Sequence, residues 1–239
     1  MLPIDRSHLY DGQEVALECV GETVWIPGPA GPLEGLTACP ERESQGVVAV
    51  ILHPHPLYGG SLQNKVVHYL SRICNRLGIP SLRFNFRGVG RSGGHYDQGR
   101  GEVADCLAVM DWVEQRRPGF PIWLAGFSFG AYVAYQAAQD PRVGRLLTIA
   151  PPVNLFDFSK VPMPTCPWTI VQGREDELVP AEAVRGWVKE QGVAARYLEL
   201  TADHFFHGAL NRLQDALLAE LAPQLPAAPG KPCADFAAP

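Results

Sequence analysis

A single serine stands at the centre of Gly126–Gly130, which has the sequence Gly-Phe-Ser-Phe-Gly and joins two contrasting stretches of the chain. Residues 120–125 form a short apolar run typical of a buried strand, and residues 131–138 are small and apolar, as in a tightly packed helix. Glycines on both sides let a strand and a helix approach closely around a sharp, strained turn. The pattern G-x-S-x-G at such a joint is typical of a nucleophile elbow, which exposes the serine. A glycine-rich turn with an incidental serine is the alternative.

Apolar strand-like runs alternate with helical stretches on both sides of this turn. Strands are predicted at 47–53, 81–86, 120–125, 145–150, 168–172 and 196–200, and helices at about 62–77, 101–116, 131–138, 181–190 and 206–221. This alternation predicts an α/β protein with a parallel sheet and helices on both faces. Earlier strand signals occur at 14–20, 23–27 and 32–38, and the last two are joined by a Gly- and Pro-rich segment. They predict an antiparallel edge that precedes the main sheet.

The chain of 239 residues is long enough for a large core, and we expect a single domain over 1–222. Repeated prolines without periodicity predict a disordered tail over 223–239. The net charge of −5 favours neither a nucleic acid nor an anionic membrane as a partner. No apolar run approaches the roughly 18 residues that span a bilayer, and the N-terminal residues lack a secretory pattern, which predicts a cytoplasmic protein. Six cysteines without a C-x-x-C pair are typical of reduced thiols.

A serine hydroxyl becomes a strong nucleophile only when a base removes its proton, and a further acceptor must orient that base. Two loops that follow strands after Ser128 offer candidates, the first at 172–180 and the second at 201–208. The first loop carries three adjacent carboxylates and the second carries two histidines: Glu175, Asp176, Glu177, His204 and His207. His204 lies nearer the end of its strand than His207. Residue types alone leave these alternatives open.

Attack of a serine on a carbonyl also needs two backbone N–H groups aimed at the developing oxyanion. Phe129, directly after the serine, supplies the first. The second is expected on the loop after strand 47–53, which reads His-Pro-His-Pro-Leu-Tyr-Gly over 53–59. The two prolines of this loop lack an N–H and are excluded as donors. The alternating histidines of this loop also resemble metal ligands, but no third ligand stands at a recognisable spacing, and we predict no metal site.

A second glycine-rich segment, Gly88–Gly93, matches the dinucleotide-binding pattern G-x-G-x-x-G and follows the strand at 81–86. In that motif a helix opens at the third glycine, and an acid follows about 20 residues later at the end of a strand. Here residues 94–101 delay the helix, and the nearest suitably spaced acid, Asp111, lies inside a predicted helix. We therefore interpret the segment as a structural loop beside the site and predict no cofactor.

Four motifs in this order resemble those of the small bacterial α/β-hydrolases related to dienelactone hydrolases and serine esterases. The motifs are Val50–Ser61, Arg83–Ser92, Gly126–Gly130 and Asp203–His207. The resemblance covers roughly residues 14–221 and implies an α/β-hydrolase fold with a Ser–His–Asp triad. The interval of 48 positions between Ser128 and the acid at 176 (176 − 128) leaves no room for a lid domain.

The resemblance also selects among the open candidates. The family's G-x-x-D-x-x-V-P loop implies Asp176 as the acid, and its A/S-D/S-H-F-F motif implies His204 as the base. Its H-G-x-x-G loop, registered on His55, implies Leu57 as the second oxyanion donor, and this is the donor we predict. Registration on His53 would imply His55 itself. True dienelactone hydrolases carry a cysteine at the elbow, so the serine here argues against the dienelactone reaction.

We therefore expect a serine carboxylesterase that cleaves small soluble short-chain esters through an acyl-enzyme on Ser128. A thioesterase or small peptidase with the same triad is the nearest alternative, because a triad specifies acyl transfer and leaves the leaving group open. A non-catalytic hydrolase-fold binding protein is the third. The expected partner is a small-molecule ester, and the chemistry requires no cofactor.

Overall fold

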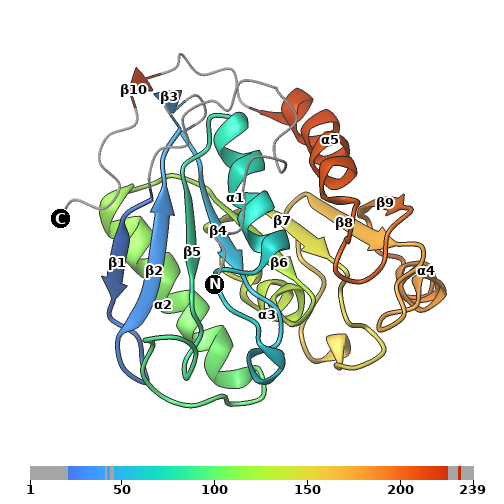
Figure 1. Ribbon diagram of the computed structural model, residues 1–239, viewed down its shortest axis with the longest axis horizontal. Helices are drawn as coiled ribbons and strands as arrows, with labels where there is room; N and C mark the ends of the chain where they lie inside the picture. The colour runs from blue at the N-terminus through green and yellow to red at the C-terminus, as the bar shows by residue number, and fades with distance from the viewer. Residues whose placement is uncertain (1–20, 41, 44–45, 226–230, 233–239) are drawn as a thin grey trace, which may run out of the picture.

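A computed structural model describes residues 21–40, 42–43, 46–225 and 231–232. Its centre is an eight-stranded sheet in the order β1-β2-β5-β4-β6-β7-β8-β9 (Figure 1). The strands are β1 (Thr23–Ile26), β2 (Leu33–Ala38), β4 (Val48–Leu52), β5 (Ser81–Phe84), β6 (Ile122–Phe127), β7 (Val143–Ile149), β8 (Trp168–Gly173) and β9 (Arg196–Leu200). All pairs among β4 to β9 are parallel: β4 lies between β5 and β6, and β7, β8 and β9 follow β6. At the other edge, β1 pairs antiparallel with β2, and β2 pairs antiparallel with β5. The predicted mostly parallel sheet with an antiparallel edge is confirmed.

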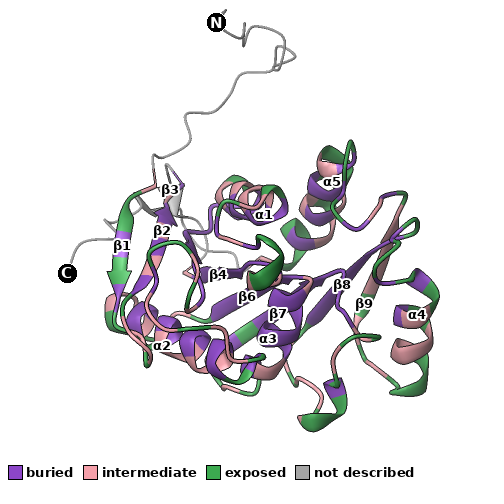
Figure 2. Ribbon diagram, turned by 60° about the horizontal axis from the view of Figure 1, so that its bottom comes forward, coloured by how far each residue is buried: buried purple, intermediate pink, exposed green. Residues whose placement is uncertain are grey.

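Helices cover both faces of the sheet. They are α1 (Lys65–Arg76), α2 (Arg100–Arg116), α3 (Phe129–Ala137), α4 (Ala181–Glu190) and α5 (Leu210–Leu221). Figure 2 shows α1 and α5 on one side of the strands and α2, α3 and α4 on the other. Strand β4 explains how one sheet serves two cores: Val48, Val50 and Leu52 pack on the side of α2 and α3, while Ala49 and Ile51 pack on the side of α1 and α5. A strand buried on both faces reads as a continuous apolar run, as the sequence indicated.

Two features of the chain differ from the predicted elements. Helix α5 begins at Leu210, later than the predicted 206, because Phe206 and Gly208 have positive φ angles of 56° and 63° that an α-helix does not allow. Within the segment 223–239, Lys231–Pro232 (β10) pairs antiparallel with Arg42–Glu43 (β3), a two-residue pairing that the sequence did not predict.

The remaining predictions about the chain ends stay predictions. The strand expected at 14–20 lies outside the described residues, as do 226–230 and 233–239. At the proposed domain boundary, a short 3₁₀ helix, η3 (Ala222–Gln224), follows α5, and Leu225 packs against the α1 and α5 core. In the described part of the chain, no helix is both long enough and apolar enough to span a bilayer.

The parallel strands fix where a site can form. Because they run in the same direction, the loops after β4, β6, β8 and β9 all emerge at one edge of the sheet, their carboxyl ends. These are the loops on which the sequence analysis placed the serine, the acid, the histidine and the oxyanion donor. The topology therefore brings residues from four distant stretches of sequence to one edge.

Candidate active site

Ser128 occupies a strained turn between β6 and α3. Its φ of 53° and ψ of −119° are sparsely populated for a residue with a side chain, and such strain persists where the surrounding structure enforces it. The Ser128 N–H donates to Ile149 O at 2.8 Å, which ties the turn to β7. A Cβ on Gly126 would lie 2.2 Å from Gly130 O, and one on Gly130 would lie 2.4 Å from Leu52 O. Strand and helix approach so closely that neither flanking position accepts a side chain, which is the geometry of a nucleophile elbow.

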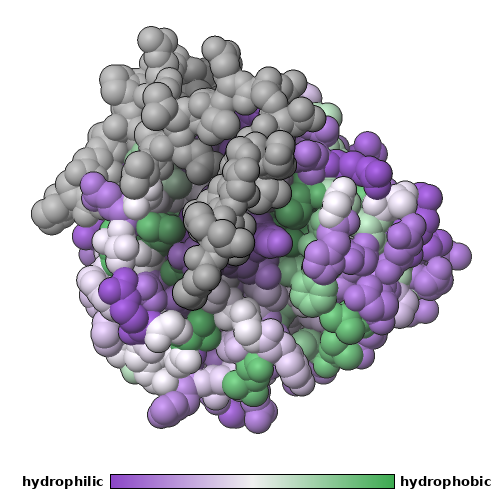
Figure 3. Space-filling view, in the orientation of Figure 1, coloured by the Kyte–Doolittle hydropathy of each residue, from purple (hydrophilic) through white to green (hydrophobic). Residues whose placement is uncertain are grey.

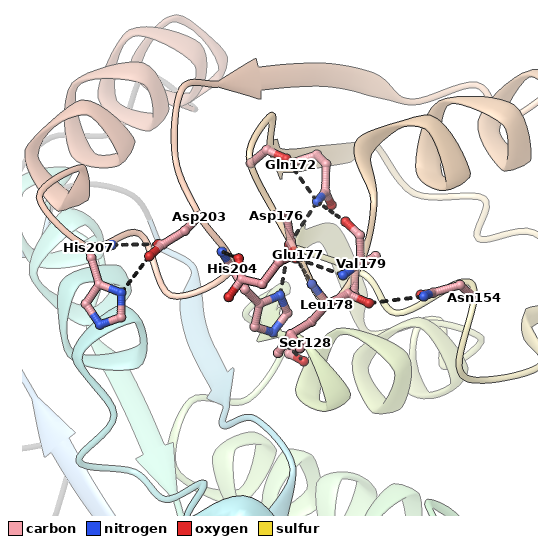
Figure 4. A network of polar contacts seen from close by, with 11 residues as sticks. Ser128, Asn154, Gln172, Asp176, Glu177, Leu178, Val179, Asp203, His204 and His207 are labelled. Carbon is pink, nitrogen blue, oxygen red and sulfur yellow. Dashed lines mark hydrogen bonds and ion pairs between the residues drawn. The ribbon is translucent and has the colours of Figure 1, made fainter.

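His204 lies on the turn between β9 and α5 and reaches across to this serine. Its Nε2 atom is 3.1 Å from Ser128 Oγ (Figure 4). The side chain is only 3% exposed, and its ring packs against Phe127 and Phe205, with centroids 5.3 and 5.0 Å apart. The contacts with these two phenylalanine rings hold the imidazole in an orientation in which one nitrogen faces the serine and the other faces the loop after β8.

Asp176 lies on that loop. Its Oδ2 atom is 2.8 Å from His204 Nδ1 and also accepts a hydrogen bond from Gln172 Nε2 at 3.0 Å. Its Oδ1 atom accepts the N–H groups of Leu178 and Val179 at 3.0 and 2.7 Å. These four contacts hold the buried carboxylate in one orientation, with Oδ2 against the imidazole.

The competing acids and the competing histidine are placed differently, and Glu177 reaches only the backbone N–H of His204, at 3.5 Å from its Oε2 atom. Glu175 and Glu177 are exposed, whereas Asp176 is only 6% exposed. The side chain of His207 is 70% exposed, and its Nδ1 atom pairs with Asp203 Oδ2 at 2.6 Å. Figure 4 shows the His207 ring turned away from the Ser128, His204 and Asp176 group. The structure thus brings together the three residues that the resemblance selected.

The oxyanion side matches the predictions only in part. Phe129 is the first residue of α3, and within the described residues its N–H has no hydrogen-bond partner, so it is free to donate. The Leu57 N–H instead donates to His55 Nδ1 at 3.2 Å, and the Leu57 side chain is 67% exposed. Because of this contact, the Leu57 N–H points toward the His55 ring of its own loop, which argues against Leu57 as the second donor to the oxyanion. The His55 N–H has no partner within the described residues and becomes the better candidate.

His53 is a structural residue at the end of β4. It is fully buried; its Nε2 atom accepts the Phe86 N–H at 3.1 Å, and its Nδ1 atom lies 2.6 Å from Pro54 O. Burial lowers the pKa of His53 from 6.5 to about 4, so the ring is neutral at pH 7. Among the described residues, no group of three or more His, Cys, Asp or Glu side chains is placed to hold a metal ion.

The glycine-rich segment Gly88–Gly93 packs against the β1–β2 hairpin. The Gly93 N–H donates to Pro32 O at 2.8 Å, and Ser92 Oγ accepts the Glu34 N–H at 2.9 Å. Helix α2 begins only at Arg100, so the third glycine opens no helix. The segment is a structural loop beside the site, as interpreted from the sequence.

Two residues of the site were missed by the sequence analysis. Gln172 holds Asp176 Oδ2 and the Val179 carbonyl, at 3.0 and 2.9 Å. The Tyr96 hydroxyl lies 3.1 Å from His55 Nε2. Gln172 did carry a signal, because it is a polar residue that ends an otherwise apolar strand at a loop with a candidate acid. Tyr96 carried none, since its contact spans 41 positions of the chain.

Comparison with known proteins agrees with this fold. Residues 50–239 match the alpha/beta hydrolase family, and the chain belongs to that family. A lidless a/b serine hydrolase from Xanthomonas campestris is 41% identical, with a TM-score of 0.83 over 87% of this chain and 97% of that one. An alpha-beta serine hydrolase homologue from Coxiella burnetii is 44% identical, with a TM-score of 0.81 over 84% of this chain and 97% of that one. An uncharacterized protein from Rickettsia prowazekii is 39% identical over 194 residues, which cover 77% of this chain and 81% of the relative.

Proposed function

We propose that this α/β-hydrolase is a carboxylesterase in which Ser128 is the nucleophile, His204 the general base and Asp176 the residue that orients the base. The observation that carries the proposal is the continuous relay from Ser128 Oγ to His204 Nε2 and from His204 Nδ1 to Asp176 Oδ2, at 3.1 and 2.8 Å. A carboxylate accepts hydrogen bonds and does not donate them, so the neutral His204 ring carries its hydrogen on Nδ1. The Nε2 lone pair then faces the serine hydroxyl, as a general base requires.

The relay supports a two-step acyl transfer. Ser128 Oγ attacks the ester carbonyl while His204 Nε2 takes the hydroxyl proton, and the imidazolium is stabilised by Asp176. The same proton then passes to the leaving alkoxide, and the alcohol departs. Water repeats the sequence on the acyl-enzyme, with His204 again as the base, and releases the acid.

Backbone N–H groups stabilise the negative charge on the carbonyl oxygen in both steps. We assign the first to Phe129, as the sequence predicted, and the second to His55 in place of Leu57. A crystal structure of the enzyme inactivated by a phosphonate ester tests this choice, because the phosphonyl oxygen occupies the oxyanion position. The proposal predicts that oxygen within hydrogen-bond distance of the Phe129 and His55 nitrogens, and a contact with the Leu57 nitrogen instead would overturn the second assignment.

Exposed apolar side chains around the site indicate the kind of substrate. Among the described residues six large apolar side chains are exposed, and five lie on loops that carry or contact site residues: Leu57, Tyr58, Leu155, Leu178 and Phe205. The Tyr58 ring packs at a tilt against His55, and the Phe205 ring meets the His204 ring edge to face. Asn154 donates to the Leu178 carbonyl at 3.1 Å. Figure 3 shows apolar side chains at the lower edge of the molecule, where Figure 1 draws the short turn after β4 and the loop after β7. This rim favours a small ester with an apolar acyl or alcohol part.

A thioesterase or small peptidase remains the alternative because it would use the same residues. The decisive experiment compares kcat/KM for matched ester, thioester and amide substrates with one short acyl group, and Ser128→Ala provides the blank. A carboxylesterase prefers the ester over the amide by orders of magnitude. A higher kcat/KM for the thioester or the amide would replace the proposal with the alternative, and no turnover of any of the three would support a binding protein.

We also propose a cytoplasmic location, as the sequence predicted. Cys74, Cys106 and Cys166 are free thiols in the structure, which is the state that a reducing compartment maintains. Cell fractionation of a tagged chain tests this placement, and recovery in an extracellular or membrane fraction would contradict it.

A further inference from the structure

The half-buried ring of His55 lies between two polar groups beside the site. Its Nδ1 atom accepts the Leu57 N–H at 3.2 Å, and its Nε2 atom lies 3.1 Å from the Tyr96 hydroxyl oxygen. The ring also packs against Phe129, with centroids 5.0 Å apart. Since Phe129 directly follows Ser128, the His55 ring connects the loop after β4, the loop before α2 and the first residue of α3.

These two contacts fix the position of the ring hydrogen. A ring nitrogen that accepts an N–H carries no hydrogen itself, so Nδ1 is unprotonated and the neutral ring bears its hydrogen on Nε2. The Nε2–H group then donates to the Tyr96 oxygen. Burial lowers the pKa of His55 below its ordinary value, which keeps the ring neutral at pH 7.

The Nδ1 contact also caps the turn that follows the proposed oxyanion donor. His55 is the residue before η1 (Pro56–Tyr58), and its side chain accepts the N–H two residues on, as N-terminal capping side chains do. Its carbonyl accepts the N–H groups of Tyr58 and Gly60, both at 3.1 Å. The side chain and the carbonyl of one residue thus hold the backbone on the C-terminal side of the His55 N–H.

We propose that His55 and Tyr96 form a positioning pair for the oxyanion hole: the neutral His55 ring, held by the Tyr96 hydroxyl, caps the Leu57 N–H and thereby fixes the direction of the His55 N–H. The inference rests on the proposed function, because the direction of this N–H affects turnover only if a tetrahedral intermediate forms on Ser128. Both side chains are positioning residues, and neither is assigned a contact with the reacting atoms.

Three single variants and one double variant separate positioning from packing. His55→Phe keeps an aromatic ring beside Phe129 but removes the cap, and we expect kcat to fall by about 10- to 100-fold with KM within about twofold, somewhat less than the loss of a whole oxyanion donor. In His55→Asn the carboxamide oxygen can accept the Leu57 N–H, and we expect activity to recover to within about fivefold of the wild type. Tyr96→Phe removes only the hydroxyl that holds the His55 ring, and we expect kcat to fall by about three- to tenfold. The double variant His55→Phe/Tyr96→Phe is no slower than His55→Phe, since the two residues act as a unit.

An inhibitor that forms a tetrahedral adduct gives a readout that a merely structural role would not move. The inhibition constant of a trifluoromethyl ketone should rise in the variants by the same factor by which kcat/KM falls, while melting temperatures stay close to that of the wild type. Equal losses in His55→Asn and His55→Phe, or a loss confined to KM, would overturn the proposal.

Nitrogen-15 NMR of the wild type at pH 7 tests the geometry without turnover. The His55 signals, assigned by their loss in His55→Phe, should show an unprotonated Nδ1 and a protonated Nε2. A proton on Nδ1 overturns the positioning pair whatever the kinetics show. If the wild type hydrolyses no ester, thioester or amide, the proposed function fails, and the catalytic role of the pair fails with it even if the predicted NMR signals appear.

Discussion

Replacement of Asp176 by asparagine tests the orienting role of the acid with almost no change of volume. The carboxylate accepts N–H groups from two sides, with Leu178 N and Val179 N at 3.0 and 2.7 Å from Oδ1, and Gln172 Nε2 and His204 Nδ1 at 3.0 and 2.8 Å from Oδ2. An asparagine has only one acceptor oxygen. The two backbone donors cannot turn away, so they retain that oxygen and leave the new NH₂ group facing Gln172 and His204.

The new NH₂ group has two consequences of different size. It donates to His204 Nδ1, which forces the ring hydrogen onto Nε2 and leaves no lone pair for the Ser128 proton. In Ser–His–Asp triads this change of tautomer costs about 10⁴ in kcat, or about 5.4 kcal/mol at 1.36 kcal/mol per factor of ten. It also opposes the Gln172 NH₂ group, and a buried donor left without an acceptor costs about 1–3 kcal/mol of stability. We therefore expect kcat to fall by about 10³- to 10⁴-fold, with a melting temperature about 2–10 °C lower.

The assay measures kcat and KM on a short-chain p-nitrophenyl ester and the melting temperature by circular dichroism. Glu175→Gln is the matched control, because it neutralises the adjacent carboxylate, which is exposed, and it should leave both quantities close to wild type. A kcat for Asp176→Asn within tenfold of the wild type would refute the orienting role. So would an equal loss in Glu175→Gln, since it would point to loop charge as the cause.

Three further outcomes are expected. His204→Ala should lose as much activity as Ser128→Ala, the double variant should be no worse, and His207→Ala should stay near wild type; an inactive His207→Ala beside an active His204→Ala would reverse the choice of base. Because burial lowers the pKa of His53 from 6.5 to about 4, the unfolded chain binds that proton first, so about 3 kcal/mol of stability is present above pH 6.5 and lost as the pH falls to 4. Urea unfolding measures the free energy of unfolding at pH 7 and at pH 4. Between these two pH values, His53→Gln should lose less of this free energy than the wild type, and an equal loss in both proteins would contradict the expectation. Since the described residues between β6 and Asp176 form only α3, β7, a short 3₁₀ turn and β8, with no lid domain among them, hydrolysis should favour soluble esters of about two to six acyl carbons. Each further methylene gains about 0.8 kcal/mol only where a wall buries it. A rate jump on long-chain triglyceride emulsions would contradict the open site.

The sequence predicted the parts of the structure that local patterns encode. Buried parallel strands appear as continuous apolar runs, so the sheet around β4 and β6 could be identified from composition alone. The elbow could also be predicted from the sequence, because its geometry requires glycine at two fixed positions. A Cβ on Gly126 or Gly130 would lie 2.2 or 2.4 Å from a backbone oxygen. The choice of Asp176 over its two neighbours came from the resemblance, and the reason for it is burial, which composition does not reveal.

Features that depend on contacts distant in sequence could not be predicted. The direction of the Leu57 N–H depends on a ring nitrogen of His55, and that ring is held by Tyr96, 41 positions away. The pairing of β3 with β10 joins two-residue segments from opposite ends of the chain, which are too short to carry a strand pattern. The late start of α5 follows from the turn that presents His204, whose positive φ angles no apolar periodicity reports.

Identification of the residue labelled by a fluorophosphonate tests the central claim most directly. Such probes bond covalently to a serine that a base has activated, so intact-mass and peptide analysis report both the nucleophile and its activation. We expect one adduct, on Ser128, formed by the wild type, absent in Ser128→Ala and slowed by orders of magnitude in His204→Ala. An adduct on another residue, or equal labelling of Ser128→Ala, would contradict it.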